Sequence, residues 1–309
     1  MKKITAIILT VILTLSTVAF AAEFKDMPDD WSTAALNAAV KNGLLTGSDG
    51  YINASGKMTR AEMATIMVRA CGATKTADIS AFSDVKGGDW YYDYMSKAVA
   101  MGAFAGSDGK LNPENPITRQ EAFVVLSRVF ALTAGLDKTQ SVLDTFKDAD
   151  KIADWAKGGV NAITARGYVA GDNGYIKPLN NITRAEFAVV MDRLIKYYID
   201  DLSDNIPEDG NMMIRIPANA LSELDTDKMV VLGDGMGECD IVLKGNNMTG
   251  KLVVRGGKTV TLDGGSYNEV SVVAHGVTLN AFSSKLKKAF NQYADSKFIL
   301  PAIVGPESN

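Results

Sequence analysis

Three arginines stand in the same short motif, and the groups around them limit the chemistry they could perform. "MTRAE" covers residues 58–62, "ITRQE" covers 117–121 and "ITRAE" covers 182–186, which places the arginines at Arg60, Arg119 and Arg184. A guanidinium presents a planar fork of N–H donors that matches a carboxylate or a phosphate. The motif therefore predicts either an anion-binding site or an ion pair with an acidic side chain of this chain.

Helix capping accounts for the threonine and the glutamate of the motif. Thr-x-x-Glu before an apolar run is a capping box, in which the two side chains satisfy backbone N–H groups at the helix start. It predicts N-caps at Thr59, Thr118 and Thr183, with the paired glutamates at Glu62, Glu121 and Glu186. Capping leaves the arginine unexplained, because the positive end of the helix dipole disfavours a cation there by up to about 1 kcal/mol.

Two explanations of the arginine are open at this point. The first is internal pairing with an aspartate of a neighbouring unit, for which Asp26, Asp84 and Asp148 are the candidates. The second is a bound anion, which the free N–H groups of a helix N-terminus and the guanidinium would hold together. Repetition does not decide between them, since a structural pair would also be repeated.

Each motif closes the same longer pattern, so the chain contains an internal repeat. Every unit opens with Phe-x-Asp, continues with a tryptophan and a helical pattern, and reaches a glycine-rich turn before the motif and a second apolar helix. The turns read "GSDGYI", "GSDGKL" and "GDNGYI", in which Asp-Gly and Asn-Gly favour a tight reversal. We therefore expect three helix-turn-helix units, which bury their apolar faces only when packed together.

This triplicate pattern resembles the S-layer homology domain, from Phe24 to about residue 200. The second copy departs from the usual motif at Gln120, a position that carries no charge. The resemblance implies a mostly helical assembly with pseudo-threefold symmetry and a groove between adjacent units. It also implies non-covalent binding of a secondary cell-wall polysaccharide that carries pyruvate ketals, with Arg60, Arg119 and Arg184 contacting the anionic group. On that basis the anion-binding explanation is the favoured one.

The resemblance also implies that turn residues line the grooves, although ordinary turn chemistry explains each of them equally well. These residues are Gly47, Ser48, Asp49, Gly106, Ser107, Asp108, Gly171 and Asp172. The tryptophans Trp31, Trp90 and Trp155 could stack on sugar rings. We instead expect them to be structural residues that anchor the first helix of each unit to the core.

The remaining segments have different characters. Two lysines, an apolar run and Ala-x-Ala predict a signal peptide over 1–21, with an uncleaved anchor as the alternative. The repeats are assigned to 24–81, 82–145 and 146–204, followed by a polar linker over 205–212. Short β-branched runs with Gly and Asn corners predict an all-β domain over 213–282, which we expect to be a right-handed β-solenoid, with an open sheet or sandwich as the alternative. An amphipathic pattern predicts a capping helix and tail over 283–309.

Other classes of function have weak support. The net charge of −4 argues against a nucleic-acid partner. "RGGKT" at 255–259 resembles the end of a phosphate loop, but Leu252 stands where the pattern needs glycine, so no nucleotide is expected. His275 is the sole histidine, which argues against a histidine triad or a multi-histidine metal site. The sequence thus predicts a secreted, non-catalytic wall anchor without cofactors, with an S-layer lattice protein or a glycan-active enzyme as alternatives.

Overall fold

The computed structural model describes residues 24–136, 141–202, 207, 209–222 and 224–300. The predicted signal peptide and the tail beyond residue 300 lie outside these ranges. Within them, no helix combines the length and the apolar character needed to cross a membrane.

Each repeat contributes two α-helices to the N-terminal part of the chain, as the sequence predicts. They are α1 (Thr33–Lys41) and α2 (Arg60–Cys71), α3 (Tyr92–Ala100) and α4 (Arg119–Val129), and α5 (Asp154–Ala165) and α6 (Arg184–Leu194). Two short 3-10 turns, η1 (Leu143–Thr145) and η2 (Ala149–Lys151), precede α5. The predicted helical, repeat-based fold of this part is confirmed.

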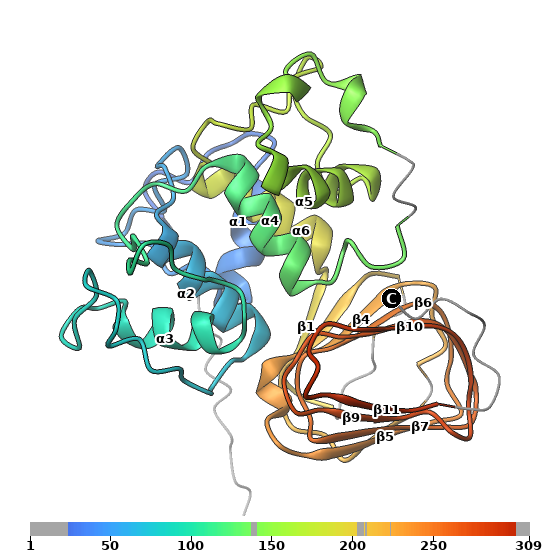
Figure 1. The fold of residues 1–309 in the computed structure, drawn as a ribbon. Helices are drawn as coiled ribbons and strands as arrows, with labels where there is room; N and C mark the ends of the chain where they lie inside the picture. The colour runs from blue at the N-terminus through green and yellow to red at the C-terminus, as the bar shows by residue number, and fades with distance from the viewer. Residues whose placement is uncertain (1–23, 137–140, 203–206, 208, 223, 301–309) are drawn as a thin grey trace, which may run out of the picture.

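The helices pair between repeats, so that no repeat is complete by itself. The second helix of one repeat packs against the first helix of the next, which joins α2 to α3 and α4 to α5. The third repeat returns to the first, because α6 packs against α1. Figure 1 shows the consequence at the centre of the domain, where α6 from the end of the helical region lies beside α1 from its beginning. The three repeats form a closed ring.

A cycle of backbone hydrogen bonds lies at the axis of this ring. The residue before each capping threonine takes part: Met58 N donates to Ile182 O, Ile182 N to Ile117 O, and Ile117 N to Met58 O, at 2.9–3.1 Å. All three side chains are fully buried. Since a buried backbone group without a partner is costly, this cycle fixes the three motif segments relative to one another.

The C-terminal part is a β-solenoid, which confirms the predicted fold. Its two sheets are entirely parallel, and they face each other across an apolar interior (Figure 1). One sheet has the order β1-β2-β4-β6-β8-β10 and the other the order β11-β9-β7-β5-β3. The strands are β1 (Tyr197–Ile199), β2 (Met212–Ile214), β3 (Ala220–Ser222), β4 (Met229–Leu232), β5 (Asp240–Lys244), β6 (Asn247–Val254), β7 (Thr259–Asp263), β8 (Ser266–Val272), β9 (Thr278–Asn280), β10 (Lys285–Asn291) and β11 (Lys297–Ile299), with a 3-10 turn η3 (Asp234–Met236) after β4.

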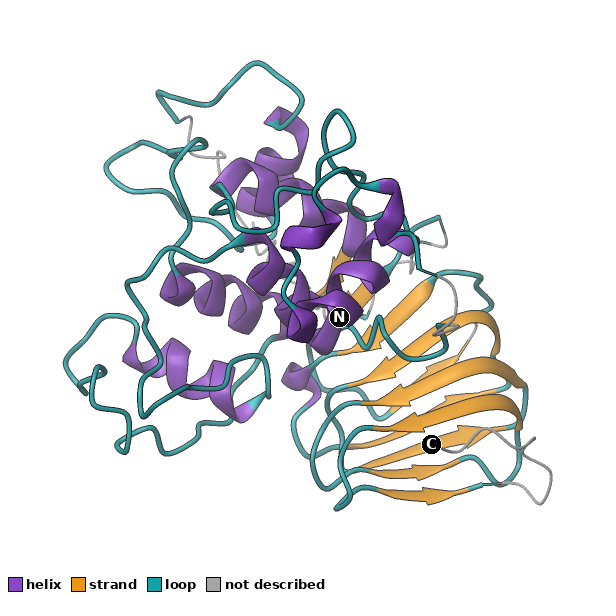
Figure 2. Ribbon diagram, turned by 45° about the horizontal axis from the view of Figure 1, so that its top comes forward, coloured by secondary structure: helices purple, strands orange, loops and turns teal. Residues whose placement is uncertain are grey.

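The later turns of the solenoid repeat every 19 residues. Asp240 pairs with Thr259, Thr259 with Thr278, and Thr278 with Lys297. The same interval places Ile241, Val260 and Leu279 in one buried inward column. Figure 2 shows the strands stacked turn upon turn. Adjacent parallel strands lie about 4.7–4.9 Å apart, so such columns form a continuous core.

The prediction of a capping helix over 283–309 is wrong for the described part of that segment, which forms β10 and β11. The spacing of Leu286, Phe290 and Tyr293 suits a helical face. In the fold, however, Leu286 pairs with Tyr267 of β8, and both side chains are buried in the solenoid. Stacking on the preceding turn therefore overrides the local amphipathic pattern. The β-rich part also extends beyond its predicted limits, since β1 lies within residues assigned to the third repeat.

One sheet of the solenoid packs against the helical ring. Met213, Val231 and Val253 form a row across β2, β4 and β6, and they belong to the same hydrophobic core as the helices. This sheet therefore has both faces covered, one by the solenoid interior and one by the helical repeats. The two parts of the chain share a continuous core rather than a flexible connection.

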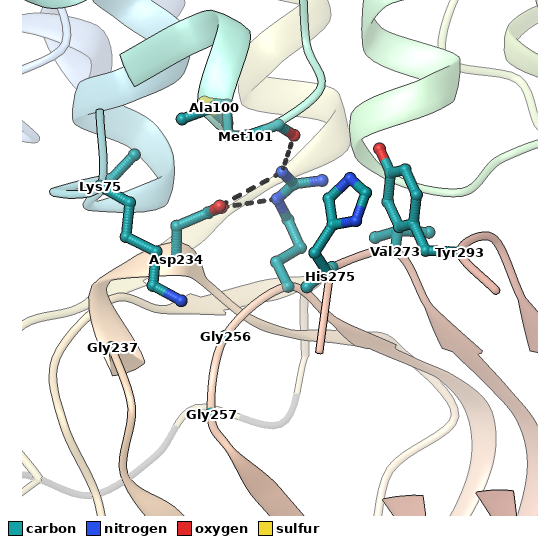
Figure 3. A pocket seen from close by; sticks show the side chains of 13 residues that line it. Lys75, Ala100, Met101, Asp234, Gly237, Gly256, Gly257, Val273, His275 and Tyr293 are labelled. Carbon is teal, nitrogen blue, oxygen red and sulfur yellow. Dashed lines mark hydrogen bonds and ion pairs between the residues drawn. The ribbon is translucent and has the colours of Figure 1, made fainter. Parts of the chain in front are cut away.

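Basic side chains of the solenoid terminate the helices at this interface. Arg255 donates to Val129 O and Met101 O, each at 2.8 Å, at the ends of α4 and α3, and its Nε lies 2.7 Å from Asp234. Arg215 similarly donates to Arg69 O and Asn42 O, at the ends of α2 and α1. Helix C-termini carry unpaired carbonyl groups and a partial negative charge. A cation placed there donates hydrogen bonds to the carbonyls and offsets the charge. Figure 3 shows Asp234 and Met101 together at this interface.

Replacing Arg255 tests this interface. In Arg255→Met, buried Asp234 loses its partner and two helix-terminal carbonyls lose their donor. We expect the free energy of unfolding to fall by about 3–5 kcal/mol, as for other broken buried pairs. Urea denaturation of the mature chain measures it, and Lys287→Met on the exposed side of β10 is the matched control. A change no larger than that of the control would contradict the role of Arg255.

Candidate functional site

The capping box is present at the start of all three second helices. The side chains of Thr59, Thr118 and Thr183 accept a hydrogen bond from the backbone N–H of the glutamate three residues later, and each glutamate accepts one from the N–H of its threonine. The arginine follows directly as the first residue of the helix. Its side chain therefore leaves the helix at the edge that faces the next repeat.

Each motif arginine pairs with the motif glutamate of the next repeat. The Nη1–Oε1 distances are 3.5 Å for Arg60 with Glu121, 2.8 Å for Arg119 with Glu186, and 3.0 Å for Arg184 with Glu62. The Nε atoms donate to backbone carbonyls of the same neighbouring repeats, at Leu111, Ile176 and Ile52, each at 2.9 Å. The arginines thus form a second cycle around the ring, outside the backbone cycle.

The aspartates considered as partners have a different role. Asp26 accepts the backbone N–H groups of Ile52 and Asn53 at 2.6 and 2.8 Å, which fixes the turn of its own repeat. Asp84 and Asp148 make the equivalent contacts in the second and third repeats. The expectation of an arginine pair with these residues is therefore wrong, and the internal partner is the capping glutamate.

The helix N-termini do not offer free backbone donors, which corrects one step of the sequence-based hypothesis. Arg60 N donates to Asn115 O and Ala61 N to Pro113 O, both in the loop of the second repeat. The other two helices make equivalent bonds, from Arg119 and Gln120 and from Arg184 and Ala185. Any anion at these sites must therefore be held by side chains.

The motif arginine side chains are mostly buried, but a small part of each remains exposed to solvent. Their side chains are 16% exposed for Arg60, 10% for Arg119 and 12% for Arg184. Burial lowers the pKa of Arg60 and of Arg119 below the ordinary value, and the facing glutamates oppose that shift. Because an arginine pKa lies far above neutrality, the guanidiniums remain charged.

Two of the arginines open into grooves built from all three repeats. A groove of about 710 Å³ is lined by Arg184 of the third repeat, by the turn of the first repeat, and by Trp90 of the second. A groove of about 420 Å³ is lined by Arg60 of the first repeat, by the turn of the second, and by Trp155 of the third. The sequence places these residues far apart, and the closed ring brings them together.

The tryptophans are exposed, so the prediction that they anchor the first helices to the core is wrong. The exposed fraction is 65% for Trp31 and 61% for both Trp90 and Trp155. Trp90 and Trp155 stand at the two grooves instead. Both indole rings are therefore accessible from the grooves that they line.

The turn residues divide into two kinds. Gly47, Ser48 and Asp49 line the first groove, and Ser107 lines the second. The glycine is required by packing, because a Cβ at Gly47 would overlap Phe24 and approach Tyr51 O to 2.6 Å. A Cβ at Gly106 or Gly171 would likewise overlap Phe82 or Phe146. The glycines thus let the turns pack closely on the phenylalanines, while the Ser48 and Ser107 hydroxyls donate to the carboxylates of Asp49 and Asp108.

Each repeat contains a second arginine that was not among the residues predicted from the sequence to line the grooves. Arg69 lines the first groove and Arg128 the second, so each groove contains two guanidiniums. Arg69, Arg128 and Arg193 donate to the equivalent carbonyls of Leu44, Ala103 and Tyr168 at 3.3–3.4 Å. Each lies nine residues after the motif arginine of its repeat. That constant offset in the printed sequence is the signal that could have identified them.

The features considered for catalysis, Arg255 and His275, line one small pocket of about 60 Å³ at the contact between the helices and the solenoid. Arg255 of "RGGKT" is buried in the contact with the helices, and exposed His275 lies 3.1 Å from Asp295 and stacks on Tyr293 (Figure 3). In the described part of the chain, no three His, Cys, Asp or Glu side chains are grouped so as to hold a metal ion. The grooves are therefore the leading candidate for function.

Comparison with known proteins identifies the repeats. The family model for the S-layer homology domain matches residues 23–64, 81–123 and 145–188. Among curated proteins, the chain is 34% identical over 187 residues to the surface-layer 125 kDa protein of Lysinibacillus sphaericus, which is 58% of this chain and 15% of that protein. It is 28% identical over 175 residues to an amylopullulanase of Thermoanaerobacterium thermosulfurigenes, which is 56% of this chain and 9% of that protein. It is 27% identical over 168 residues to the S-layer protein sap of Bacillus anthracis, which is 53% of this chain and 20% of that protein. The matches thus span a fifth or less of each of these relatives.

Substitution of Gly47 tests the close packing of the first turn on Phe24. In Gly47→Ala, the new methyl group overlaps Phe24 and Tyr51 O, and the residue has a φ of +63° that L-residues rarely adopt. We expect a loss of about 2 kcal/mol or more in the free energy of unfolding, as for strained glycine replacements. The matched control is Gly87→Ala, where the methyl group meets open space. Equal stabilities of the two variants in urea would contradict this interpretation.

Proposed function

The chain carries three S-layer homology domains, and from this premise we propose that it anchors itself to the cell wall by holding an anionic glycan in the grooves between them. It is a secreted cell-surface protein whose domain content is that of a wall anchor. The proposed ligand is a secondary cell-wall polysaccharide whose sugars carry pyruvate ketals. Each ketal presents one carboxylate on a sugar ring.

The composition of the two grooves carries this proposal. The motif arginine uses Nε and Nη1 inside the ring, and the bonds between described residues leave Nη2 of Arg60 and Arg184 without a partner. A guanidinium already held in place loses little freedom when it binds a carboxylate, so its remaining donor is preorganised. The second arginine, Arg69 or Arg128, adds a further cation to the same groove.

The tryptophans supply the part of the site that recognises the sugar. Trp90 and Trp155 are exposed beside an arginine from another repeat. An amphipathic aromatic ring offers an apolar surface at little cost in conformational entropy. A groove lined by both a guanidinium and an indole ring matches a sugar ring that carries a carboxylate.

Several grooves on one chain suit retention on a polymer. A polysaccharide with many ketals can occupy more than one groove, and linked binding raises the overall avidity by 10² to 10⁴ without new contacts. Non-covalent anchoring of an exported protein needs slow release rather than a strong single site. We assign the β-solenoid, which is packed rigidly on the ring, to a non-catalytic display role on the outward side.

The central experiment measures retention of the mature chain on purified cell-wall sacculi. We expect binding that disappears after mild acid removes pyruvate ketals, and that falls at least tenfold in an Arg60→Lys, Arg184→Lys variant. Lysine keeps the charge but loses the fork that bonds both the carbonyl and the carboxylate. The matched control is Lys228→Arg, a change among basic residues on the solenoid. Retention that persists after the acid treatment would overturn the proposed ligand.

Removal of the tryptophans separates binding from stability. In Trp90→Ala, Trp155→Ala, we expect weaker binding to sacculi, by roughly two- to tenfold per ring, from the loss of about 0.5–1.5 kcal/mol of aromatic contact. The melting temperature should stay close to that of the parent, because both rings are mostly exposed. Phe282→Ala on the solenoid, where the side chain is 70% exposed, is the control. A lower melting temperature with unchanged binding would return the tryptophans to a structural role.

A further inference from the structure

One sheet of the solenoid has an outer face that lies on the side away from the helical ring (Figure 1). The strands β5, β7, β9 and β11 direct alternate side chains into the solenoid interior and the others outward. The main packing contacts of these strands are with one another and with β3. The outer face carries two rows of side chains that cross the four strands, one beginning at Asp240 and the other at Val242.

The first row has opposite charges at its two ends. Its members are Asp240, Thr259, Thr278 and Lys297, which follow one another in the register of adjacent strands. Asp240 and Lys297 are exposed, and neither forms an ion pair with a residue that the structure describes. The hydroxyl groups of the two threonines likewise form no hydrogen bond to described residues. The row therefore offers a negative end, a positive end and two hydroxyl groups to another molecule.

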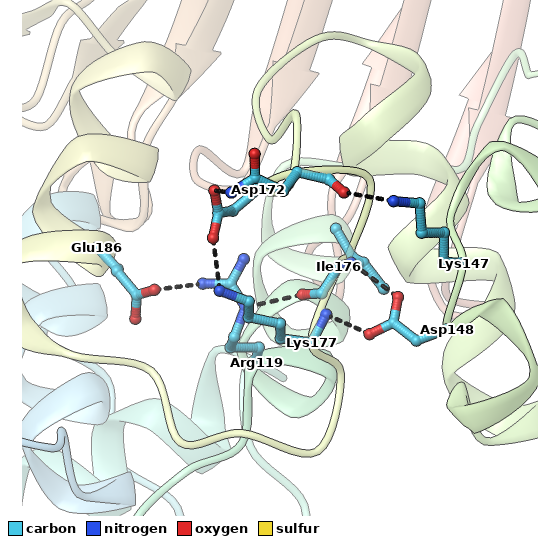
Figure 4. A network of polar contacts seen from close by, with 8 residues as sticks. Arg119, Lys147, Asp148, Asp172, Ile176, Lys177 and Glu186 are labelled. Atoms are coloured by element: carbon cyan, nitrogen blue, oxygen red, sulfur yellow. Dashed lines mark hydrogen bonds and ion pairs between the residues drawn. The ribbon is translucent and has the colours of Figure 1, made fainter.

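The charged residues near the first row, unlike its two ends, are paired within the chain. At the corner of the solenoid that precedes these strands, Glu238 pairs with Lys75 and Asp295 with His275. Figure 4 shows two further internal ion pairs in the helical part. The charges at the ends of the first row have no such partner and are free to meet charges of another molecule.

The second row is apolar at its ends and polar at its centre. Its members are Val242, Thr261, Asn280 and Ile299, again in register. Ile299 is 49% exposed, and Val242 is partly exposed. In both rows, then, the end on β5 and the end on β11 carry groups that attract each other, and short polar side chains stand between them.

A second copy of the same face complements both rows. A two-fold axis parallel to the strands, between β7 and β9, brings two outer faces together and reverses the order of their strands. Asp240 of one copy then faces Lys297 of the other, Val242 faces Ile299, and the polar residues of β7 face those of β9. The strands of the two sheets remain nearly aligned, as in ordinary face-to-face packing of sheets.

The match exists in one alignment of the two faces. If the axis ran through β7 instead, Asp240 would face Thr278, and Val242 would face Asn280. A two-fold interface uses the same surface on both copies, so it forms only where that surface is complementary to itself. Only the alignment about the line between β7 and β9 brings the opposite charges of the first row together.

The small size of the outer face limits the strength of this pairing. Four strands of three to five residues, about 4.8 Å apart, cover roughly 200–300 Å² per copy. Stable interfaces bury about 800 Å² per partner. The pairing is therefore weak in dilute solution, and it becomes populated where chains are held close together, because tethering raises the effective concentration to about the millimolar range.

We propose that the outer face of the solenoid is a contact surface for a second copy of this chain, formed by the two-fold pairing of Asp240 with Lys297 and of Val242 with Ile299. The helical ring lies on the opposite side of the solenoid, so the contact leaves its grooves uncovered. The contact joins neighbouring chains in pairs, and it does not depend on the ligand that the grooves hold.

Charge exchange in the mature chain tests the pairing. By sedimentation equilibrium at up to about 1 mM, we expect the parent to form dimers with a Kd of roughly 1 mM or below. Lys297→Asp places like charges opposite each other at two points of the dimer, and association should fall roughly tenfold or more. Asp240→Lys combined with Lys297→Asp exchanges the charges and should restore association to within about threefold of the parent. Lys287→Asp, the same change on β10 of the other sheet, is the matched control and should leave association unchanged.

Crosslinking tests the alignment of the two faces. In a Cys239→Ala background, chains with Val242→Cys are mixed with chains with Ile299→Cys and treated with a bis-maleimide that spans about 10 Å, the separation of packed sheets. We expect a crosslinked dimer in the mixture and none from either variant alone, because like positions lie at opposite ends of the interface.

Three results would overturn the inference. They are a parent that stays monomeric at about 1 mM, a charge exchange that fails to restore association, and crosslinks formed by one cysteine variant alone. Dimers that are unchanged by Lys297→Asp would place the contact elsewhere and would overturn it as well. Circular dichroism of each variant verifies the fold, which we expect to be retained because Asp240, Lys297 and Ile299 are exposed.

Discussion

Three backbone hydrogen bonds around the axis of the helical ring are the constraint on which the rest of the structure depends. Met58, Ile117 and Ile182 each donate a backbone hydrogen bond to one of the others and accept one from the third. The cycle is therefore complete only when all three repeats are present. The arginine–glutamate cycle surrounds this centre and runs in the opposite sense, because each arginine donates to the next repeat whereas each backbone N–H donates to the preceding one. Because the bonds and the apolar side chains are buried together, the ring behaves as one cooperative unit. A single repeat would expose the packed faces of both its helices, because each of them pairs with a helix of another repeat.

The grooves are a consequence of this closure. Each of the two described grooves takes its arginine, its turn and its tryptophan from three different repeats, which meet only when the ring is complete. The motif arginines that line these grooves also join neighbouring repeats through Nε and Nη1. Internal pairing, the first explanation considered from the sequence, is therefore present with the capping glutamates as partners, and it does not exclude the proposed anion.

The solenoid adds a second constraint at the opposite ends of the helices. Arg215 and Arg255 donate hydrogen bonds to carbonyls at the ends of four helices. Arg255 is buried and Arg215 partly buried because the sheet lies against the ring, and the apolar row through Val231 completes the contact. The helical part therefore relies on the solenoid to satisfy its C-termini.

The sequence by itself determined the local elements of the helical repeats. Capping boxes, Asp-Gly turns and the triple motif depend on residues within a few positions of one another, so they predict the three helix pairs correctly. The β-branched runs likewise predicted the solenoid. Only the tertiary structure decided which side chains meet. The partner of Arg60 is Glu121, Trp90 lies in a groove with Arg184, and Leu286 belongs to a strand because Tyr267 is stacked beneath it. These outcomes depend on contacts between distant segments, which local spacing does not encode.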